Sequence, residues 1–231
     1  YMAGTIRELG VDVRSLPIHV VVVEALGRNA GWTTAAAALA REQGEDAPHL
    51  LYPPERPFVE EEFLEETAAM QRRYGGVVIV ASEGLHGADG KPIVEPIFQT
   101  GRSTYFGDVS SHLAQLVVRR LGIKARSEKP GILARASIAW QSPVDAAEAE
   151  EAGRAACRAA LAGESGSMVA FRRLPGEEYR CETFLAPIEQ VMLGERTMPA
   201  EYLSGSDVTR EFIDWCRPLI GPELPRMARL F

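Results

Sequence analysis

Two short runs of β-branched residues constrain the fold of this chain more than any other feature. Residues 20–23 are four consecutive valines, and residues 77–80 read Val-Val-Ile-Val. A strand with one solvated face shows a polar residue at every second position, whereas a strand buried on both faces reads as a continuous apolar run. The two runs therefore predict interior strands of a sheet that is covered on both sides.

Helical patterns alternate with these strands. Residues 31–44, 58–76 and 110–122 have the apolar spacing of helices, and residues 48–54 and 123–131 predict two further short strands. Parallel strands need long crossover connections, which are usually helices. The alternation therefore predicts an α/β fold, with a Rossmann-like, mostly parallel sheet flanked by helices.

The two ends of the chain suggest how it is organised. Residues 1–17 read as the tail of an amphipathic helix without an N-cap residue, which we interpret as the end of a helix from a preceding part of the protein. Residues 1–186 are predicted to form one α/β domain. They end with a helix at 142–163 and a hairpin formed by 166–174 and 178–184. Residues 187–231 predict a helical segment that packs back on the N-terminal part.

The charge and cysteine content exclude several classes of protein. The chain has 25 Lys and Arg against 32 Asp and Glu, a net charge of −7, which argues against a nucleic-acid binder. The three cysteines are far apart, which suggests free thiols in a reducing compartment, and the four histidines lack the spacing of metal ligands. No apolar run approaches the roughly 18 residues of a membrane helix. We therefore expect a cytoplasmic protein that binds neither membranes nor nucleic acid.

The first candidate functional residues follow the strand at 20–24. Ligands of open α/β sheets bind beyond the carboxyl ends of the strands, and Leu26, Gly27 and Arg28 lie there. The free N–H groups at the start of the following helix can bind an anion, Gly27 allows close approach, and Arg28 can reach an oxyanion. The alternative interpretation is a surface arginine beside a tight turn.

Two other strand ends carry polar candidates. Glu83 follows the strand at 77–82 and could accept hydrogen bonds from sugar hydroxyls, although a glutamate that caps a turn is a common alternative. Arg126 and Arg135 lie nine residues apart in the segment that also holds Lys124 and Lys129. Clustered arginines suit a phosphate group. The alternative for this segment is a solvated charged loop.

The order of these motifs resembles the phosphofructokinase family. The stretches "VVVVEALGRNAGW", "VVIVASEG" and "LGIKARSEKPGILARAS" are similar to that family's Met-Gly-Arg loop, sugar-binding glutamate and phosphate-binding arginines. The tail "DVTREFIDWCRPLIGPELP" resembles the pyrophosphate-dependent and mixed-donor branch. The resemblance implies the C-terminal portion of a 6-phosphofructokinase. Residues 1–186 would then be its sugar-phosphate-binding domain, and the N-terminal donor-binding part would be missing.

The resemblance also implies roles for the first two strand ends. Leu26, Gly27 and Arg28 would hold fructose 6-phosphate, and Arg28 would be catalytic, near the transferred phosphoryl group. Glu83 would bind sugar hydroxyls. Phosphoryl transfer depends mainly on positioning and on cationic stabilisation, which these residue types can supply.

The 6-phosphate contacts implied by the resemblance include departures from the family pattern. Arg126 would reach the 6-phosphate bound by a neighbouring subunit, and Arg135 the 6-phosphate in its own subunit. His19 stands where the family usually has an arginine, and we include it among the substrate-binding candidates. Ile132 and Ala134 replace a histidine or other polar residue and a glutamine. These changes weaken the expected 6-phosphate site.

The donor and the metal ion are expected to be bound elsewhere. The family's Gly-Gly-Asp donor loop and Thr-Asp catalytic segment would precede Tyr1, so pyrophosphate, ATP and Mg²⁺ would be bound mainly by that part. We therefore expect this chain to be inactive alone and to assemble as a homodimer or homotetramer. Two alternatives remain open. One is a phosphofructokinase-like subunit that binds sugar phosphates without catalysis, and the other is a Rossmann-like module for an unrelated ligand.

Overall fold

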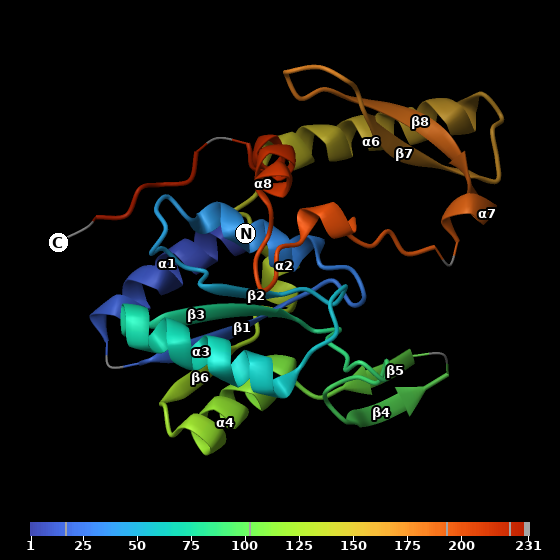
Figure 1. Ribbon diagram of the computed structural model, residues 1–231. Coiled ribbons are helices and arrows are strands. Elements are labelled where there is room, and N and C mark those ends of the chain that lie inside the picture. Colours follow the sequence, from blue (N-terminus) through green and yellow to red (C-terminus); the bar gives the residue numbers. More distant parts are fainter. Residues whose placement is uncertain (17, 102, 193, 222, 229–231) are drawn as a thin grey trace. The chain divides into compact units, whose positions relative to one another are not determined.

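The computed structural model in Figure 1 describes residues 1–16, 18–101, 103–192, 194–221 and 223–228. The chain divides into two compact units. Unit 1 consists of Tyr1–Trp140, Thr197–Asp214 and Leu224–Phe231, and unit 2 consists of Gln141–Arg196 and Trp215–Glu223. Neither unit matches the division that the sequence suggested between residues 186 and 187.

Unit 1 is built on a parallel sheet of four strands with the order β2-β3-β1-β6. Their bounds are Val20–Ala25 for β1, Leu50–Tyr52 for β2, Val77–Ser82 for β3 and Ala125–Glu128 for β6. The two predicted apolar runs form the central strands, where Val20 pairs with Val77 and Ala25 with Ser82. Every residue of both strands is buried, so the prediction of a parallel sheet covered on both sides is confirmed.

Helices cover the two faces of this sheet (Figure 1). On one face lie α1 (Met2–Ser15), α2 (Trp32–Ala36) and the 3₁₀ helix η1 (Ala37–Ala40). On the other lie α3 (Glu60–Tyr74) and α4 (Val109–Leu121). Alternate residues of β1 contribute to the two cores, because successive side chains of a strand point to opposite faces.

The helix predicted at 31–44 is shorter than expected and ends at Ala40. The following residues form a turn around Asp46, whose Oδ2 accepts hydrogen bonds from the backbone N–H groups of Glu42 at 2.9 Å and Gln43 at 2.8 Å. The aspartate thus satisfies backbone donors that a continued helix would have paired internally.

Two elements between β3 and unit 2 were not predicted. One is an antiparallel hairpin of β4 (Pro96–Thr100) and β5 (Ser103–Phe106). The other is the short helix α5 (Ile132–Ala136), which follows β6. Both expose most of their residues, including Ile97 and Ile132. They therefore lack the alternation of buried and exposed positions from which elements are predicted.

Unit 2 contains the helix and the hairpin that the sequence predicted. The helix α6 spans Pro143–Leu161, and Ser142 caps it by accepting a hydrogen bond from the Asp145 N–H at 3.2 Å. The strands β7 (Ser167–Arg173) and β8 (Cys181–Pro187) pair antiparallel, followed by α7 (Ile188–Val191). The 3₁₀ helix η3 (Arg217–Ile220) also belongs to this unit.

Residues 187–231, predicted to be helical, are only partly helical where the structure describes them. Besides α7 and η3, they contain η2 (Ala200–Tyr202) and α8 (Arg210–Cys216). Residues 197–214 belong to unit 1, where Asp207 accepts two hydrogen bonds of 2.8 Å from Nη1 of Arg41. None of the helices described is long and apolar enough to cross a membrane.

Candidate functional site

The carboxyl ends of β1 and β3 bring two of the predicted loops together. Ala25 and Ser82 are the last residues of these strands and lie opposite each other in the sheet. The Glu83 N–H donates to the Ala25 carbonyl at 3.0 Å and extends the pairing by one step. Gly27 and Arg28 therefore leave the sheet beside Glu83, as expected from the rule for strand ends.

The loop after β1 is a tight turn in an unusual conformation. Gly27 has a φ of 148° and Arg28 a φ of 49°, and the Ala30 N–H donates to the Gly27 carbonyl at 3.0 Å. A Cβ at position 27 would lie 2.4 Å from the Ala30 carbonyl oxygen, so only glycine fits there. A positive φ is uncommon for a residue with a Cβ, and at Arg28 it marks local backbone strain.

Glu83 holds this turn directly. Its Oε1 accepts hydrogen bonds from the N–H groups of Gly27 and Arg28, both at 3.1 Å. Glu83 therefore does cap a turn, as the alternative interpretation proposed. The Arg28 side chain is exposed, and its guanidinium forms no ion pair with the residues that the structure describes. The site thus combines a carboxylate that is hydrogen-bonded to the turn, that of Glu83, with the exposed guanidinium of Arg28.

The two loops are also joined through Ser82 and Gly84. Ser82 Oγ donates to the Arg28 carbonyl at 3.1 Å and accepts from the Gly84 N–H at 3.2 Å. A Cβ on Gly84 would lie 1.8 Å from the Arg28 carbonyl oxygen. The loops after β1 and β3 can approach this closely only because residue 84 is glycine.

Arg135 follows a third strand end at the same edge of the sheet. The strand β6 neighbours β1, with Glu128 paired to Val23, and the chain continues from its carboxyl end into α5, which carries Arg135. The Arg135 side chain is exposed. Arg28, Glu83 and Arg135 thus all follow the carboxyl ends of adjacent strands.

His19 and Arg126 lie toward the opposite end of the sheet. His19 immediately precedes β1, and its carbonyl accepts a hydrogen bond from Val77 at 2.9 Å. Arg126 pairs with Val21 on the exposed edge strand β6. The full length of β1 separates His19 from Arg28, about 20 Å at the rise of a strand. Within one chain, neither His19 nor Arg126 is brought to the loop that holds Arg28.

A groove of about 440 Å³ runs beside Arg126, between α4 and the edge strand. Its polar lining includes Ser111, Gln115 and Arg119 of α4 and Ser127 of β6. Arg126 is therefore exposed on an open edge of unit 1, where a second molecule could reach it.

An ion pair that the sequence did not predict joins the buried Glu24 of β1 to Lys129, whose side chain is 41% exposed. Glu24 of β1 is 3% exposed; its Oε1 lies 3.0 Å from Nζ of Lys129, and its Oε2 accepts from the Ser110 N–H at 3.1 Å. Lys129 also pairs with Asp108. Burial lowers the pKa of Lys129, but the hydrogen bonds to Asp108 and Glu24 outweigh it, so the pKa is raised overall.

Lys129 is thus engaged by two carboxylates, although the sequence grouped it with cations that suit a phosphate. A signal for the pair was present in the sequence, because Glu24 is the single charged residue in an otherwise apolar strand. A buried carboxylate needs a partner, but the sequence alone did not indicate which residue supplies it.

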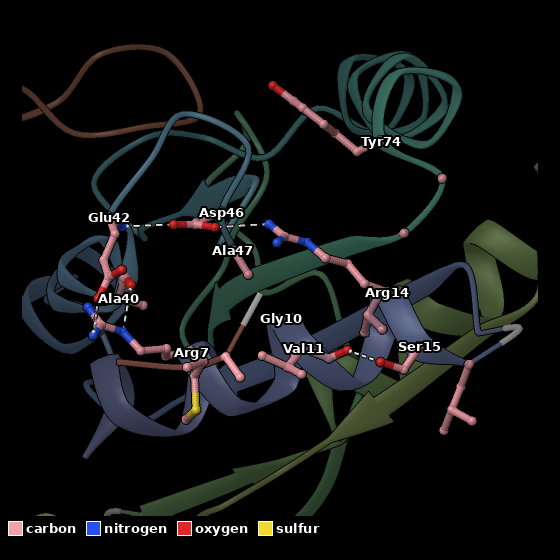
Figure 2. Close-up of a pocket in the computed structure, with 16 residues that line it drawn as sticks. Arg7, Gly10, Val11, Arg14, Ser15, Ala40, Glu42, Asp46, Ala47 and Tyr74 are labelled. Carbon is pink, nitrogen blue, oxygen red and sulfur yellow. Dashed lines mark hydrogen bonds and ion pairs between the residues drawn. The ribbon is translucent and has the colours of Figure 1, made fainter. Parts of the chain in front are cut away.

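A separate cavity of about 420 Å³ opens at the amino ends of the strands (Figure 2). Figure 2 shows Arg7 and Arg14 of α1 facing the loop that carries Glu42 and Asp46, with Tyr74 on the far side. Arg7 pairs with Glu42 at 2.8 Å and Arg14 with Asp46 at 2.9 Å. Since both arginines are paired and none of Leu26, Gly27, Arg28, Glu83 or Arg135 lines it, this cavity is not part of the candidate site.

Comparison with known proteins identifies the family. The sequence profile described as "Phosphofructokinase" matches residues 2–160, the region that holds all the candidate residues. The chain belongs to the phosphofructokinase family. The resemblance inferred from the strand-end motifs is therefore confirmed.

Relatives of the family match almost the whole chain. It is 33% identical over 242 residues to a pyrophosphate–fructose 6-phosphate 1-phosphotransferase of Rhodospirillum rubrum, covering 100% of this chain and 59% of that protein. A protein of the same name from Xanthomonas campestris is 34% identical over 232 residues, covering 97% of this chain and 56% of that protein.

A solved structure with the same fold supports this assignment. The pyrophosphate-dependent phosphofructokinase of Marinobacter aquaeolei superimposes with a TM-score of 0.82 at 31% identity. The match covers 99% of this chain and 57% of that one, so this chain spans little more than half the length of such relatives. The predicted fold class is confirmed.

Proposed function

We propose that this chain carries the acceptor-sugar site of a 6-phosphofructokinase, which transfers a phosphoryl group from pyrophosphate to the 1-hydroxyl of fructose 6-phosphate. The observation that carries the proposal is the convergence of the Gly27–Arg28 turn and Glu83 at one sheet edge. Relatives that align with nearly the whole of this chain are named for this reaction.

In this proposal, Arg28 stabilises the transferred phosphoryl group. Its guanidinium is exposed and can form two parallel hydrogen bonds to phosphoryl oxygens. Glu83 binds sugar hydroxyls with the carboxylate oxygen that does not cap the turn, while Oε1 keeps Gly27 and Arg28 in place. Leu26 supplies apolar contact beside the sugar. Positioning of this kind accounts for much of the catalysis of phosphoryl transfer.

The 6-phosphate is bound by cations from two subunits. Arg135 contacts the 6-phosphate of its own subunit, from the carboxyl edge of the sheet. Arg126 and His19 lie too far from that edge to contact the same sugar, so they bind the 6-phosphate held by a neighbouring subunit. The complete site therefore requires a homodimer or homotetramer, which we place in the cytoplasm.

The reaction also requires groups that we assign to a part of the protein outside this chain. The oxygen of the 1-hydroxyl forms a bond to phosphorus as the bridging P–O bond of pyrophosphate breaks, which releases phosphate, and the hydroxyl proton passes to a base. A general base commonly contributes about 10²–10⁴-fold in rate, so the 231-residue chain alone should show almost no turnover. ATP is the alternative donor, since one more distant relative is named an ATP-dependent 6-phosphofructokinase.

We also propose that Mg²⁺ accompanies the donor. Within the described part of the chain, no group of three or more His, Cys, Asp or Glu side chains is placed to hold a metal ion. The buried carboxylate of Glu24 is already paired with Lys129. These residues do not fit a Mg²⁺ site of their own, and we assign the ion to the donor-binding part.

An assay of the protein encoded by the complete gene tests this function. With fructose 6-phosphate and Mg²⁺, we expect formation of fructose 1,6-bisphosphate with pyrophosphate, and little or none with ATP. Binding of fructose 6-phosphate without turnover by either donor would instead support a non-catalytic sugar-phosphate-binding subunit. Absence of binding would contradict the acceptor assignment.

A further inference from the structure

The buried carboxylate of Glu24 has a position that suits a role beyond stabilising the fold. It lies in β1, three residues before Gly27, and only 3% of the residue is exposed. A buried charge is costly unless it is paired and hydrogen-bonded. The contacts of Glu24 therefore show which segments depend on it.

Glu24 joins β1 to two other segments. Its Oε2 accepts from the Ser110 N–H at 3.1 Å, one of the N–H groups that the first turn of α4 leaves without a helical partner. Its Oε1 lies 3.0 Å from Nζ of Lys129. Asp108, the N-cap residue of α4, makes no side-chain cap bond and also pairs with Lys129. Glu24 thus replaces Asp108 as the cap of α4 and leaves Asp108 to hold Lys129 from the solvent side.

Lys129 begins the segment that carries Arg135, and its ion pair with Glu24 connects this segment to β1. It directly follows β6, and a turn then leads into α5, with the Leu133 N–H donating to the Pro130 carbonyl at 2.9 Å. No residue of α5 is buried, and Leu133 is 69% exposed. Because α5 has no buried side chains to fix its position, we expect the ion pairs of Lys129, three residues before Ile132, to contribute to it.

We propose that Glu24, acting through Lys129, is a positioning residue that holds α5 so that Arg135 reaches the anionic group of the substrate. The role rests on the proposed function, in which Arg135 binds the 6-phosphate. It does not involve contact between Glu24 or Lys129 and the sugar. One buried carboxylate would then link the turn of Gly27 and Arg28, which begins three residues after it, to the helix of Arg135.

Steady-state kinetics of the complete gene product test this role. Lys129→Met should raise the KM for fructose 6-phosphate about 5- to 50-fold with kcat within about threefold, since coupled neighbours interact over this range. The Arg135→Ala background should abolish the effect, so that the double variant has the KM of Arg135→Ala alone. Lys91→Met is the matched control, because Lys91 is an exposed lysine that pairs only weakly with Asp89 at 3.5 Å. Additive effects of Lys129→Met and Arg135→Ala on KM would overturn the proposal.

A second variant addresses folding. Lys129→Met leaves Glu24 buried without a counter-ion, whereas Glu24→Gln combined with Lys129→Met removes both charges and keeps an oxygen to accept from Ser110. In this variant we expect faster hydrogen exchange of the amides at 131–136 and unchanged exchange in β1 and β3. Wild-type exchange at 131–136 would overturn the proposal. This measurement needs no substrate, so it separates the positioning role from the proposed function, which fails if wild type does not phosphorylate fructose 6-phosphate.

Discussion

Gly84 approaches Arg28 so closely that a Cβ on Gly84 would lie 1.8 Å from the Arg28 carbonyl oxygen. Ser82 reinforces this approach by donating to the same carbonyl at 3.1 Å. The positions of the Arg28 turn and of Glu83 are therefore set by backbone contact between two loops, and a single methyl group at residue 84 is enough to disturb them.

Gly84→Ala should therefore displace the Arg28 turn. We expect the free energy of unfolding to fall by about 1–3 kcal/mol, the usual cost of overpacking. Phosphorylation of fructose 6-phosphate should fall at least about tenfold, because small displacements of positioning groups are costly in rate. Urea denaturation and steady-state kinetics measure the two effects.

Gly44→Ala is the matched control. Nothing lies within 4 Å of a Cβ at Gly44, and its backbone φ is not in the region that favours glycine. We expect a change within about 0.5 kcal/mol and full activity. Wild-type activity of Gly84→Ala would show that the contact with Arg28 does not position the site.

Replacement of Arg28 should affect kcat more than KM. A guanidinium that stabilises charge developing during transfer contributes mainly in the transition state, so we expect Arg28→Ala to lower kcat about 10²-fold or more with KM within a few fold. A change confined to KM would contradict this role and indicate simple binding of the sugar phosphate.

Arg28→Gly separates charge from backbone strain. Since Arg28 has a φ of 49°, glycine relieves the strain while removing the guanidinium. We expect Arg28→Gly to be about 1 kcal/mol more stable than Arg28→Ala and equally inactive. Recovery of activity in the glycine variant would mean that the backbone at residue 28, rather than its side chain, carries the function.

The sequence predicted the strands and helices whose signals lie within a few consecutive residues. Uninterrupted valines at 20–23 identified a central strand because burial on both faces leaves no polar positions. Ser142 followed by Pro143 identified the start of α6 because both residue types favour the first turn of a helix. The exposed β4–β5 hairpin was missed, since Gln99, Thr100 and Gly101 interrupt any apolar alternation.

The contacts that define the site were not predictable in the same way. Glu83 lies 56 residues from Gly27, and its hydrogen bond to the turn depends on β1 and β3 being adjacent in the sheet. The partner of Glu24 is Lys129, which β6 brings alongside β1. Candidate residue types at the strand ends could be recognised from sequence, whereas their pairing required the strand order.

The pH dependence of stability should report on His49, a group outside the candidate site. Burial lowers the pKa of His49 from 6.5 to about 4, helped by the positive charges of Arg14 and Arg41. Its Nδ1 accepts from the Val78 N–H at 2.9 Å, which requires the neutral ring. Between pH 6.5 and 4 the unfolded state therefore binds a proton that the folded state does not, and stability falls as pH falls.

We expect wild type to lose about 2 kcal/mol more than His49→Gln between pH 7.5 and pH 5, measured by urea denaturation at both pH values. Glutamine keeps an oxygen that can accept from Val78 but does not titrate. Equal losses in the two proteins would show that His49 is not held in its neutral form.

Mixing Arg126→Ala and Arg135→Ala should test which subunit supplies each arginine, if the assay uses fructose 6-phosphate far below the raised KM of each variant, where neither alone shows appreciable activity. If Arg126 acts across the subunit boundary and Arg135 within its own subunit, homodimers of Arg126→Ala or of Arg135→Ala each lack one arginine at every site. In a mixed dimer, one site keeps both arginines, because the Arg126→Ala subunit retains Arg135 and receives Arg126 from its partner. The other site lacks both.

Random exchange of subunits from equal amounts of the two variants gives half mixed dimers. Each has one complete site of two, so we expect recovery of about a quarter of wild-type activity. If Arg126 instead acted within its own subunit, no mixed dimer would contain a complete site, and no activity would return. Because Arg126 lies on the exposed edge strand and Arg135 beyond the carboxyl end of that strand, recovery is the outcome that the geometry favours.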